Sequence, residues 1–131
     1  MNMLPLLAAL PLLAAGPPSV GQMQWHRRVL VVAAPSPDDA ALSRQRRLLA
    51  GWTGAAAERD LTVVEVVGDH VSGASDTATA LRQHLTLAPG RFAVRLIGKD
   101  GHVAWRSDHP ITAGALQTTI DAMPMRRAGQ R

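Results

Sequence analysis

Val29-Leu-Val-Val-Ala-Ala34 leads straight into Pro35-Ser-Pro-Asp-Asp39, and this junction decides the fold. An apolar run without alternation predicts a central strand that is buried on both faces. The proline, serine and aspartates that follow are typical of a helix start. We expect Ser36 to be the N-cap, the two aspartates to lie at the positive end of the helix dipole, and the helix to run to about Arg59.

The rest of the chain predicts three further strands and two further helices. Their expected positions are residues 61–67, 92–97 and 103–106 for the strands, and the segments that begin at Asp76 or Thr77 and at Thr112 for the helices. Lys99-Asp-Gly101 is a hairpin signal between the last two strands. Residues 68–75 are expected to form a loop, and Pro124 to end the last helix.

The order of these elements is strand, helix, strand, helix, strand, strand, helix. Two strands joined by a helix pair in parallel through a right-handed crossover, and a hairpin adds two antiparallel strands. The sequence therefore predicts an α/β fold, namely a thioredoxin-like three-layer sandwich. In it, βαβ is followed by αββα, and the mixed sheet has four strands.

Residues 1–15 carry no charged side chain and are about as apolar and as long as the core of a signal peptide. A membrane span would need roughly 20 residues. We expect residues 1–21 to be a signal peptide, or an apolar N-terminal segment that stays attached, and the protein to be periplasmic or secreted. The remaining divisions are expected to be a linker at 22–27, the thioredoxin-like domain at 28–124 and a basic C-terminal tail at 125–131.

The chain has no cysteine, which excludes disulfides, thiolate catalysis and thiolate metal sites. Its net charge of +4 favours acidic partners weakly. The tryptophans at positions 25, 52 and 105 are scattered, tyrosine is absent, and no aromatic platform for nucleic-acid bases is predicted.

Five long stretches carry a family resemblance: residues 25–36, 45–51, 58–69, 89–101 and 120–127. They resemble a bacterial family known as domain of unknown function 4174. The resemblance implies a peroxiredoxin-like branch of the thioredoxin fold, export, and members that commonly lack a redox thiol. It implies no settled activity. The position of the cis-proline of true thioredoxins falls near Ala93 here. The chain therefore lacks both the thiol and the proline that positions a disulfide substrate, and a thiol oxidoreductase is excluded.

Ligands of open α/β sheets bind outside the carboxyl ends of the parallel strands. In this chain those ends are residues 35–39 and 68–72, and the segment before the third strand should approach the same edge. The residues that we expect to bind a ligand there are Ser36, Asp39, Asp69, His70 and Arg91. The helix start would offer N–H donors and Arg91 a positive charge, although the aspartates would repel an anion.

Two kinds of function fit this edge. The first is a non-catalytic module that binds a protein or a small ligand and needs no cofactor, as a monomer or a weak dimer. The alternative is a non-thiol enzyme, hydrolytic or metal-assisted. In the hydrolytic version, His70 would deprotonate Ser36, which would act as the nucleophile. In the metal-assisted version, the metal ligands would be Asp69, His70 and either Asp38 or Asp39. Ser36 has an ordinary use as an N-cap, which favours the first reading.

Three charged residues within strands stand out. Glu65 interrupts an apolar strand, so it should be paired or turned to a wet face. A hairpin turn at Asp100-Gly101 puts Arg95 directly opposite Arg106. Opposed like charges are destabilising, which predicts a carboxylate or a bound anion beside them. An ordinary ion-pair network on a thinly covered face of the sheet would also satisfy these charges.

Overall fold

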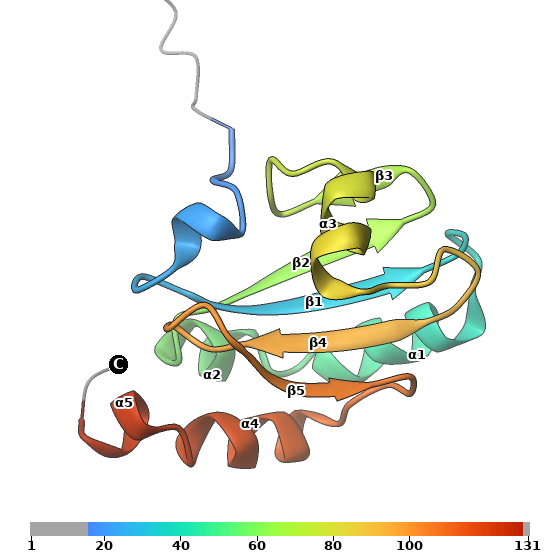
Figure 1. The fold of residues 1–131 in the computed structure, drawn as a ribbon. Helices are drawn as coiled ribbons and strands as arrows, with labels where there is room; N and C mark the ends of the chain where they lie inside the picture. The colour runs from blue at the N-terminus through green and yellow to red at the C-terminus, as the bar shows by residue number, and fades with distance from the viewer. Residues whose placement is uncertain (1–15, 130–131) are drawn as a thin grey trace, which may run out of the picture.

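A computed structural model describes residues 16–129, and the predicted signal peptide lies largely outside them. Figure 1 shows a single sheet with helices on both faces. The elements in chain order are η1 (Gly21–Met23), β1 (Arg28–Ala34), α1 (Ala40–Leu49), α2 (Thr53–Glu58), β2 (Leu61–Val67), β3 (His70–Ser72), α3 (Ala78–Leu85), β4 (Ala93–Ile97), β5 (Val103–Ser107), α4 (Ala113–Asp121) and α5 (Pro124–Arg127).

The sheet is mixed and its strand order is β3-β2-β1-β4-β5. β1 pairs with β2 in parallel, and β4 and β5 follow antiparallel to their neighbours. The α/β class and the mixed sheet are confirmed, but the predicted number of four strands is wrong. The fifth strand is β3, which lies in the predicted loop and pairs with Glu65–Val67. A strand of three residues is too short to produce a readable alternation pattern.

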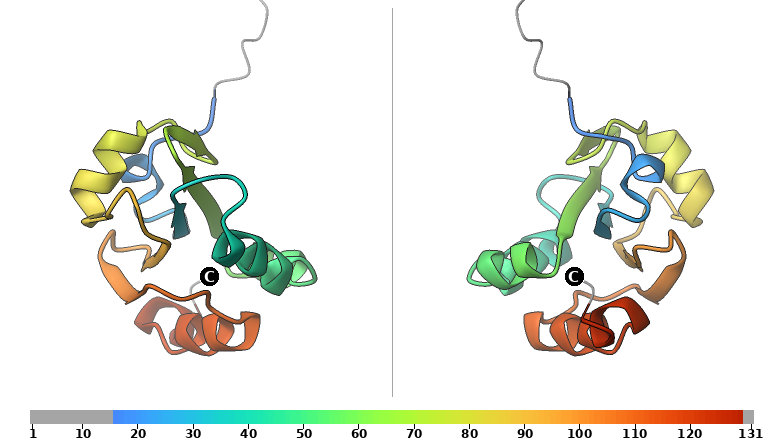
Figure 2. Two further views of the ribbon diagram at one scale, coloured as in Figure 1. Left: turned by 90° about the vertical axis from the view of Figure 1, so that its right-hand side faces the viewer. Right: turned by 90° about the vertical axis from the view of Figure 1, so that its left-hand side faces the viewer.

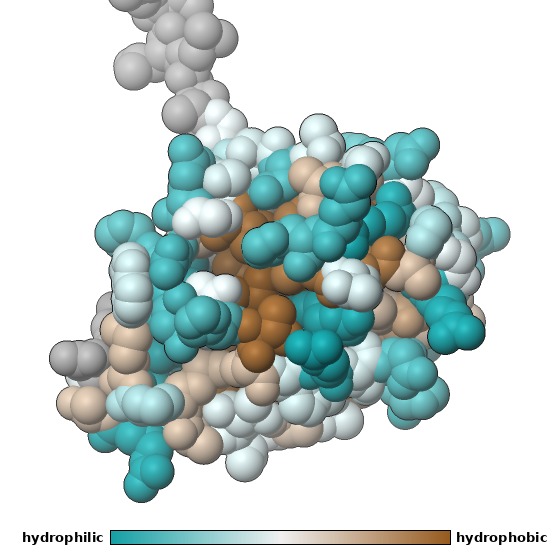
Figure 3. Space-filling view, viewed as in Figure 1, coloured by the Kyte–Doolittle hydropathy of each residue, from teal (hydrophilic) through white to brown (hydrophobic). Residues whose placement is uncertain are grey.

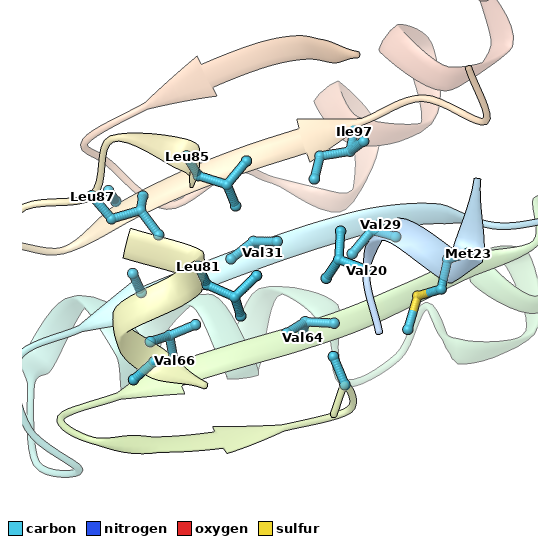
Figure 4. Packing of buried hydrophobic residues seen from close by; sticks show 14 residues of the cluster. Val20, Met23, Val29, Val31, Val64, Val66, Leu81, Leu85, Leu87 and Ile97 are labelled. Carbon is cyan, nitrogen blue, oxygen red and sulfur yellow. The ribbon is translucent and has the colours of Figure 1, made fainter. Parts of the chain in front are cut away.

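All seven residues of β1 are buried, as its unbroken apolar run predicts. Its alternate side chains enter two separate cores. Val29, Val31 and Ala33 meet α3 and the segment around η1 (Figure 4), whereas Leu30, Val32 and Ala34 meet α1 and α4. Figure 2 shows the two layers of helices on opposite sides of the sheet. One face of the sheet is covered by α3 and the segment around η1, and the other by α1, α2 and α4.

The helix predicted from Ser36 to Arg59 is two helices, α1 and α2, interrupted at residues 50–52. Its N-cap is Asp39 and not Ser36, because residues 36–38 form a turn before the helix begins. The Asp39 carboxylate accepts a hydrogen bond from the Leu42 N–H at 3.1 Å. Of the two predicted starts of α3, Asp76 and Thr77, Thr77 is the N-cap, and the predicted cap Thr112 of α4 is confirmed. Each threonine accepts a bond from a backbone N–H three residues on.

Both ends of the described chain pack against the domain. In the stretch before β1, Val20 and Met23 are buried in the core. At the other end Pro124 does not end the chain's helical structure but begins the short helix α5. Arg126 in α5 bonds to Asp121 and Glu58, at 3.3 and 3.1 Å. Among residues 16–129, no helix has the length and apolarity needed to cross a bilayer.

Candidate functional site

The structure brings the two strand-end loops together, because the Gly68 N–H donates to the Ala34 carbonyl at 3.1 Å. Ser36 and Asp39 lie in the loop after β1. Asp69 and His70 are exposed in the turn after β2 and at the start of β3, and Arg91 is exposed just before β4. The predicted residues therefore follow the expected strand ends, but they lie in three different segments.

The side chains in these segments have local partners. The Ser36 hydroxyl donates to the Asp38 carboxylate at 2.7 Å, and this bond lowers the pKa of Asp38. Asp39 caps α1. Within residues 16–129, no hydrogen bond or ion pair joins any two of the five predicted residues. The hydrolytic alternative requires a hydrogen bond from Ser36 to His70. In the structure Ser36 donates to the carboxylate of Asp38 instead.

The candidate metal cluster of Asp69, His70 and Asp38 or Asp39 is not assembled either. In the described part of the chain, no three histidine or carboxylate side chains lie close enough together to hold a metal ion.

Arg91, in contrast, lines a hollow of about 300 Å³ together with Arg95 of β4 and Arg106 of β5. We call this hollow the arginine groove. Its other lining residues are Thr86, Ala88, Phe92, Ala93, Ser107 and Asp108. It lies on the α3 side of the sheet, since Arg95 pairs with Val31 of β1, whose side chain belongs to the core on that side.

Arg95 forms the floor of the arginine groove and is held by three backbone carbonyls. Its guanidinium donates to the oxygens of Leu85 at 3.2 Å, Thr86 at 3.2 Å and Val94 at 3.0 Å. Two of these carbonyls belong to the end of α3, where helical partners run out. Carbonyl oxygens therefore take the place that the sequence assigns to a carboxylate or an anion. Burial, and then the charge of Arg106, lower the pKa of Arg95.

Arg106 lies directly opposite Arg95, as the sequence predicts, although the turn that joins their strands is longer than the expected two residues. The turn spans Gly98 to His102. A shift in the pairing register between Leu96 and Ile97 compensates for its length, so that Arg95 and Arg106 still face each other. The Arg106 side chain is exposed. Within residues 16–129 neither Arg106 nor Arg91 donates a side-chain hydrogen bond.

A single carboxylate, that of Asp108, lines the arginine groove among three arginines. Its carboxylate lies 3.2 Å from the imidazole of the exposed His109. The groove consequently carries an excess of positive charge. A fixed guanidinium with two accessible ones beside it is suited to oxygen anions, because guanidinium groups bind carboxylate, phosphate and sulfate in bidentate fashion.

Other charged residues of the protein serve its structure. Glu65 is paired, as predicted: Arg46 donates to its two oxygens at 2.6 and 3.0 Å. At the opposite end of the sheet, Lys99 bonds to Asp60 at 2.8 Å. Nearby, the buried Arg59 bonds to Asp121 through two nitrogens, at 3.0 and 3.1 Å. Lys99 and Arg59 are buried, and their carboxylate partners offset the cost of burying these charges.

A larger hollow of about 650 Å³ lies between η1, α3 and the β4–β5 turn. Figure 3 shows apolar surface at the centre of this face, framed by hydrophilic surface. The two carboxylates at its border, Asp76 and Asp100, accept hydrogen bonds from the N–H groups of Val20 and His102. They hold the surrounding loops, and no arginine or lysine lines this hollow, so it does not share the positive charge of the arginine groove.

Sequence reasoning singled out Arg91, Arg95 and Arg106 but not their meeting in one hollow. The hairpin pattern gives the pairing of the last two. Thr86, at the end of α3, carries no sequence signal that would place it beside them, because hydrophobic periodicity does not show where the end of a helix packs on the sheet.

Comparison with known proteins gives a family and distant relatives. The family model described as domain of unknown function (DUF4174) matches residues 19–129. Coiled-coil domain-containing protein 80 of Danio rerio is 24% identical over 130 residues, which cover 82% of this chain and 15% of that protein. The chain thus spans about a seventh of that relative's length. No solved structure gives a significant match. Since the family model covers nearly the whole described chain, this protein belongs to the DUF4174 family.

Proposed function

We propose that this protein is an exported, thioredoxin-like binding module without redox thiols, and that it binds an acidic group of a protein or a small ligand in the arginine groove. The function is non-catalytic. The observation that carries the proposal is the arrangement of Arg91 and Arg106, exposed and without side-chain partners in the described chain, beside the fixed Arg95.

The electrostatics support binding and not mere solvation. Arg95 and Arg106 repel each other across the hairpin, and an anion between or beside them would relieve that repulsion. Carbonyl dipoles satisfy Arg95 but do not cancel its charge. A carboxylate, phosphate or sulfate group would complete the arrangement, with the hydroxyls of Thr86 and Ser107 at the border as further donors.

The thioredoxin-like part of the proposal rests on topology. Without β3, the strand order is β2-β1-β4-β5, with one parallel pair followed by an antiparallel hairpin. This is the order expected of a minimal thioredoxin-like sheet. The absence of cysteine from the chain leaves such a fold to act by binding and not by thiol exchange.

Thermal unfolding in the presence of phosphate, sulfate and citrate tests the binding. An anion that binds the native state raises the melting temperature with its concentration, and sodium chloride weakens the effect. The rise should be lost in the double variant Arg91→Gln, Arg106→Gln. The matched control is Arg44→Gln, Arg47→Gln, which removes the same charge from α1 on the other side of the sheet. An equal rise in both double variants would contradict the proposal.

Export is tested separately by expressing the full chain with a C-terminal tag and fractionating the cells. A periplasmic or extracellular protein, shorter at its N-terminus than the translated chain, is expected. Full-length protein confined to the cytoplasm would contradict this part of the proposal and leave the anion binding untouched.

A further inference from the structure

We infer that β5 is a docking edge for an extended acidic peptide segment, which adds to the sheet as a sixth strand beside Arg106. This inference rests on the proposed function, because it names the class of partner whose acidic group would enter the arginine groove. The structural basis is the position of Arg106 in the middle of an edge strand.

β5 is the longer of the two edge strands of the sheet. Among the residues that the structure describes it pairs with β4 alone, and it spans five residues, Val103–Ser107. An unpaired strand edge presents a row of N–H and C=O groups that another strand can bind. Ala104 and Arg106 on this strand are exposed.

The opposite edge offers only the three residues of the edge strand β3 and a covered stretch of β2. There β3 covers the end of β2 over three residues. Arg27 covers the start of β2, donating to the Thr62 hydroxyl at 2.9 Å and to the Leu61 carbonyl at 3.1 Å. Gly73 lies so close to the Val63 carbonyl that a β-carbon on it would come within 2.5 Å of that oxygen. A new strand could not reach β2 without displacing these groups.

The positive charge of Arg106 determines which kind of strand can pair with β5. A second copy of this protein that paired through β5 would bring a second Arg106 beside the Arg106 that already faces Arg95 of β4, and like charges across strands are destabilising. A strand with a glutamate or aspartate opposite Arg106 would instead place a carboxylate beside the arginine pair. The same residue thus disfavours self-association and favours an acidic strand.

The test uses the protein labelled with 15N and a short, capped peptide in which glutamate alternates with threonine. Two further peptides carry backbone N-methyl groups, one on the glutamate amides and the other on the threonine amides. An added strand uses one alternate set of amides to bond to β5. One methylated peptide should therefore bind about tenfold more weakly than the parent, the loss of roughly one hydrogen bond, while the other retains its affinity.

Hydrogen exchange gives the second readout. The amides of β5 that do not donate to β4 should exchange more slowly when the parent peptide is bound, whereas inorganic phosphate should leave their exchange unchanged. The substitution Arg106→Gln should weaken binding of the parent peptide, whereas Arg44→Gln should leave its affinity unchanged.

Two results would overturn the inference in distinguishable ways. If the parent and both methylated peptides bind equally and β5 stays unprotected, strand addition is wrong while anion binding in the arginine groove stands. If neither phosphate nor the peptide binds, the proposed function fails together with the inference.

Discussion

Arg95 and Arg106 face each other across the β4–β5 hairpin, but their surroundings differ. Arg95 is half-buried and donates to carbonyls at the end of α3, whereas Arg106 is exposed and makes no side-chain hydrogen bond within residues 16–129. One member of the pair stabilises the fold. The other is available to a ligand.

Substituting the two arginines should have opposite effects. Arg106→Gln relieves the repulsion and should raise the free energy of unfolding by about 0.2–1 kcal/mol. Arg95→Gln removes donors from the α3 carbonyls and should lower it by about 1–2 kcal/mol. Denaturant unfolding of both variants checks this, and equal effects of the same sign would show that the two side chains have similar roles.

Asp39, not Ser36, should carry the capping energy of α1. Asp39→Ala leaves the Leu42 N–H without its acceptor and should lower the free energy of unfolding by about 1 kcal/mol. Ser36→Ala, which removes a bond to the exposed Asp38, should change it by less than about 0.5 kcal/mol. A larger loss in Ser36→Ala would reverse the assignment.

Gln45 should be among the most sensitive polar residues. It is 1% exposed, donates to the Ile111 carbonyl at 2.9 Å and accepts from the Ile111 N–H at 2.8 Å. Gln45→Leu leaves both backbone groups buried without partners and should cost about 2–4 kcal/mol. Gln83→Leu on the exposed side of α3 is the matched control and should be near neutral. A similar, small effect of both would contradict this role.

The Arg59–Asp121 pair should make stability depend on acid pH. Hydrogen bonds from Arg59 hold the pKa of Asp121 below its usual value of 3.8, so the native state binds its proton more weakly than the unfolded chain. The stabilisation is present above the unfolded pKa and is lost as pH falls through the folded one. The stability difference between wild type and Asp121→Asn should therefore be constant from about pH 7 to about pH 5 and shrink below about pH 4. A difference unchanged at about pH 3 would contradict it.

The segment before β1 should contribute to stability. A chain that begins at Gln22 lacks Val20, whose side chain is 9% exposed and whose N–H bonds to Asp76 at 2.8 Å. It also loses the Pro18 carbonyl, which accepts from the Ser75 N–H at 3.2 Å. Relative to a chain that begins at Gly16, it should be about 2–4 kcal/mol less stable. Val20→Ala in the longer chain should reproduce part of this loss, and equal stability of the two chains would show that the segment is dispensable.

Local pattern alone was sufficient for most of the fold. The apolar run of β1 predicts burial on both faces, the threonine caps predict where α3 and α4 begin, and the hairpin signal predicts that Arg95 opposes Arg106. These features depend on neighbours within a few residues or across one turn. The lack of cysteine excluded thiol chemistry in the same direct way.

Contacts between one element and the next decided the rest. β3 has three residues and exists because β2 offers it an edge. The end of α3 meets Arg95, which turns an expected anion site into a helix cap and leaves Arg91 and Arg106 as the accessible charges. Such contacts join residues that no short-range pattern relates, because periodicity determines which face of an element is buried but not which element covers it.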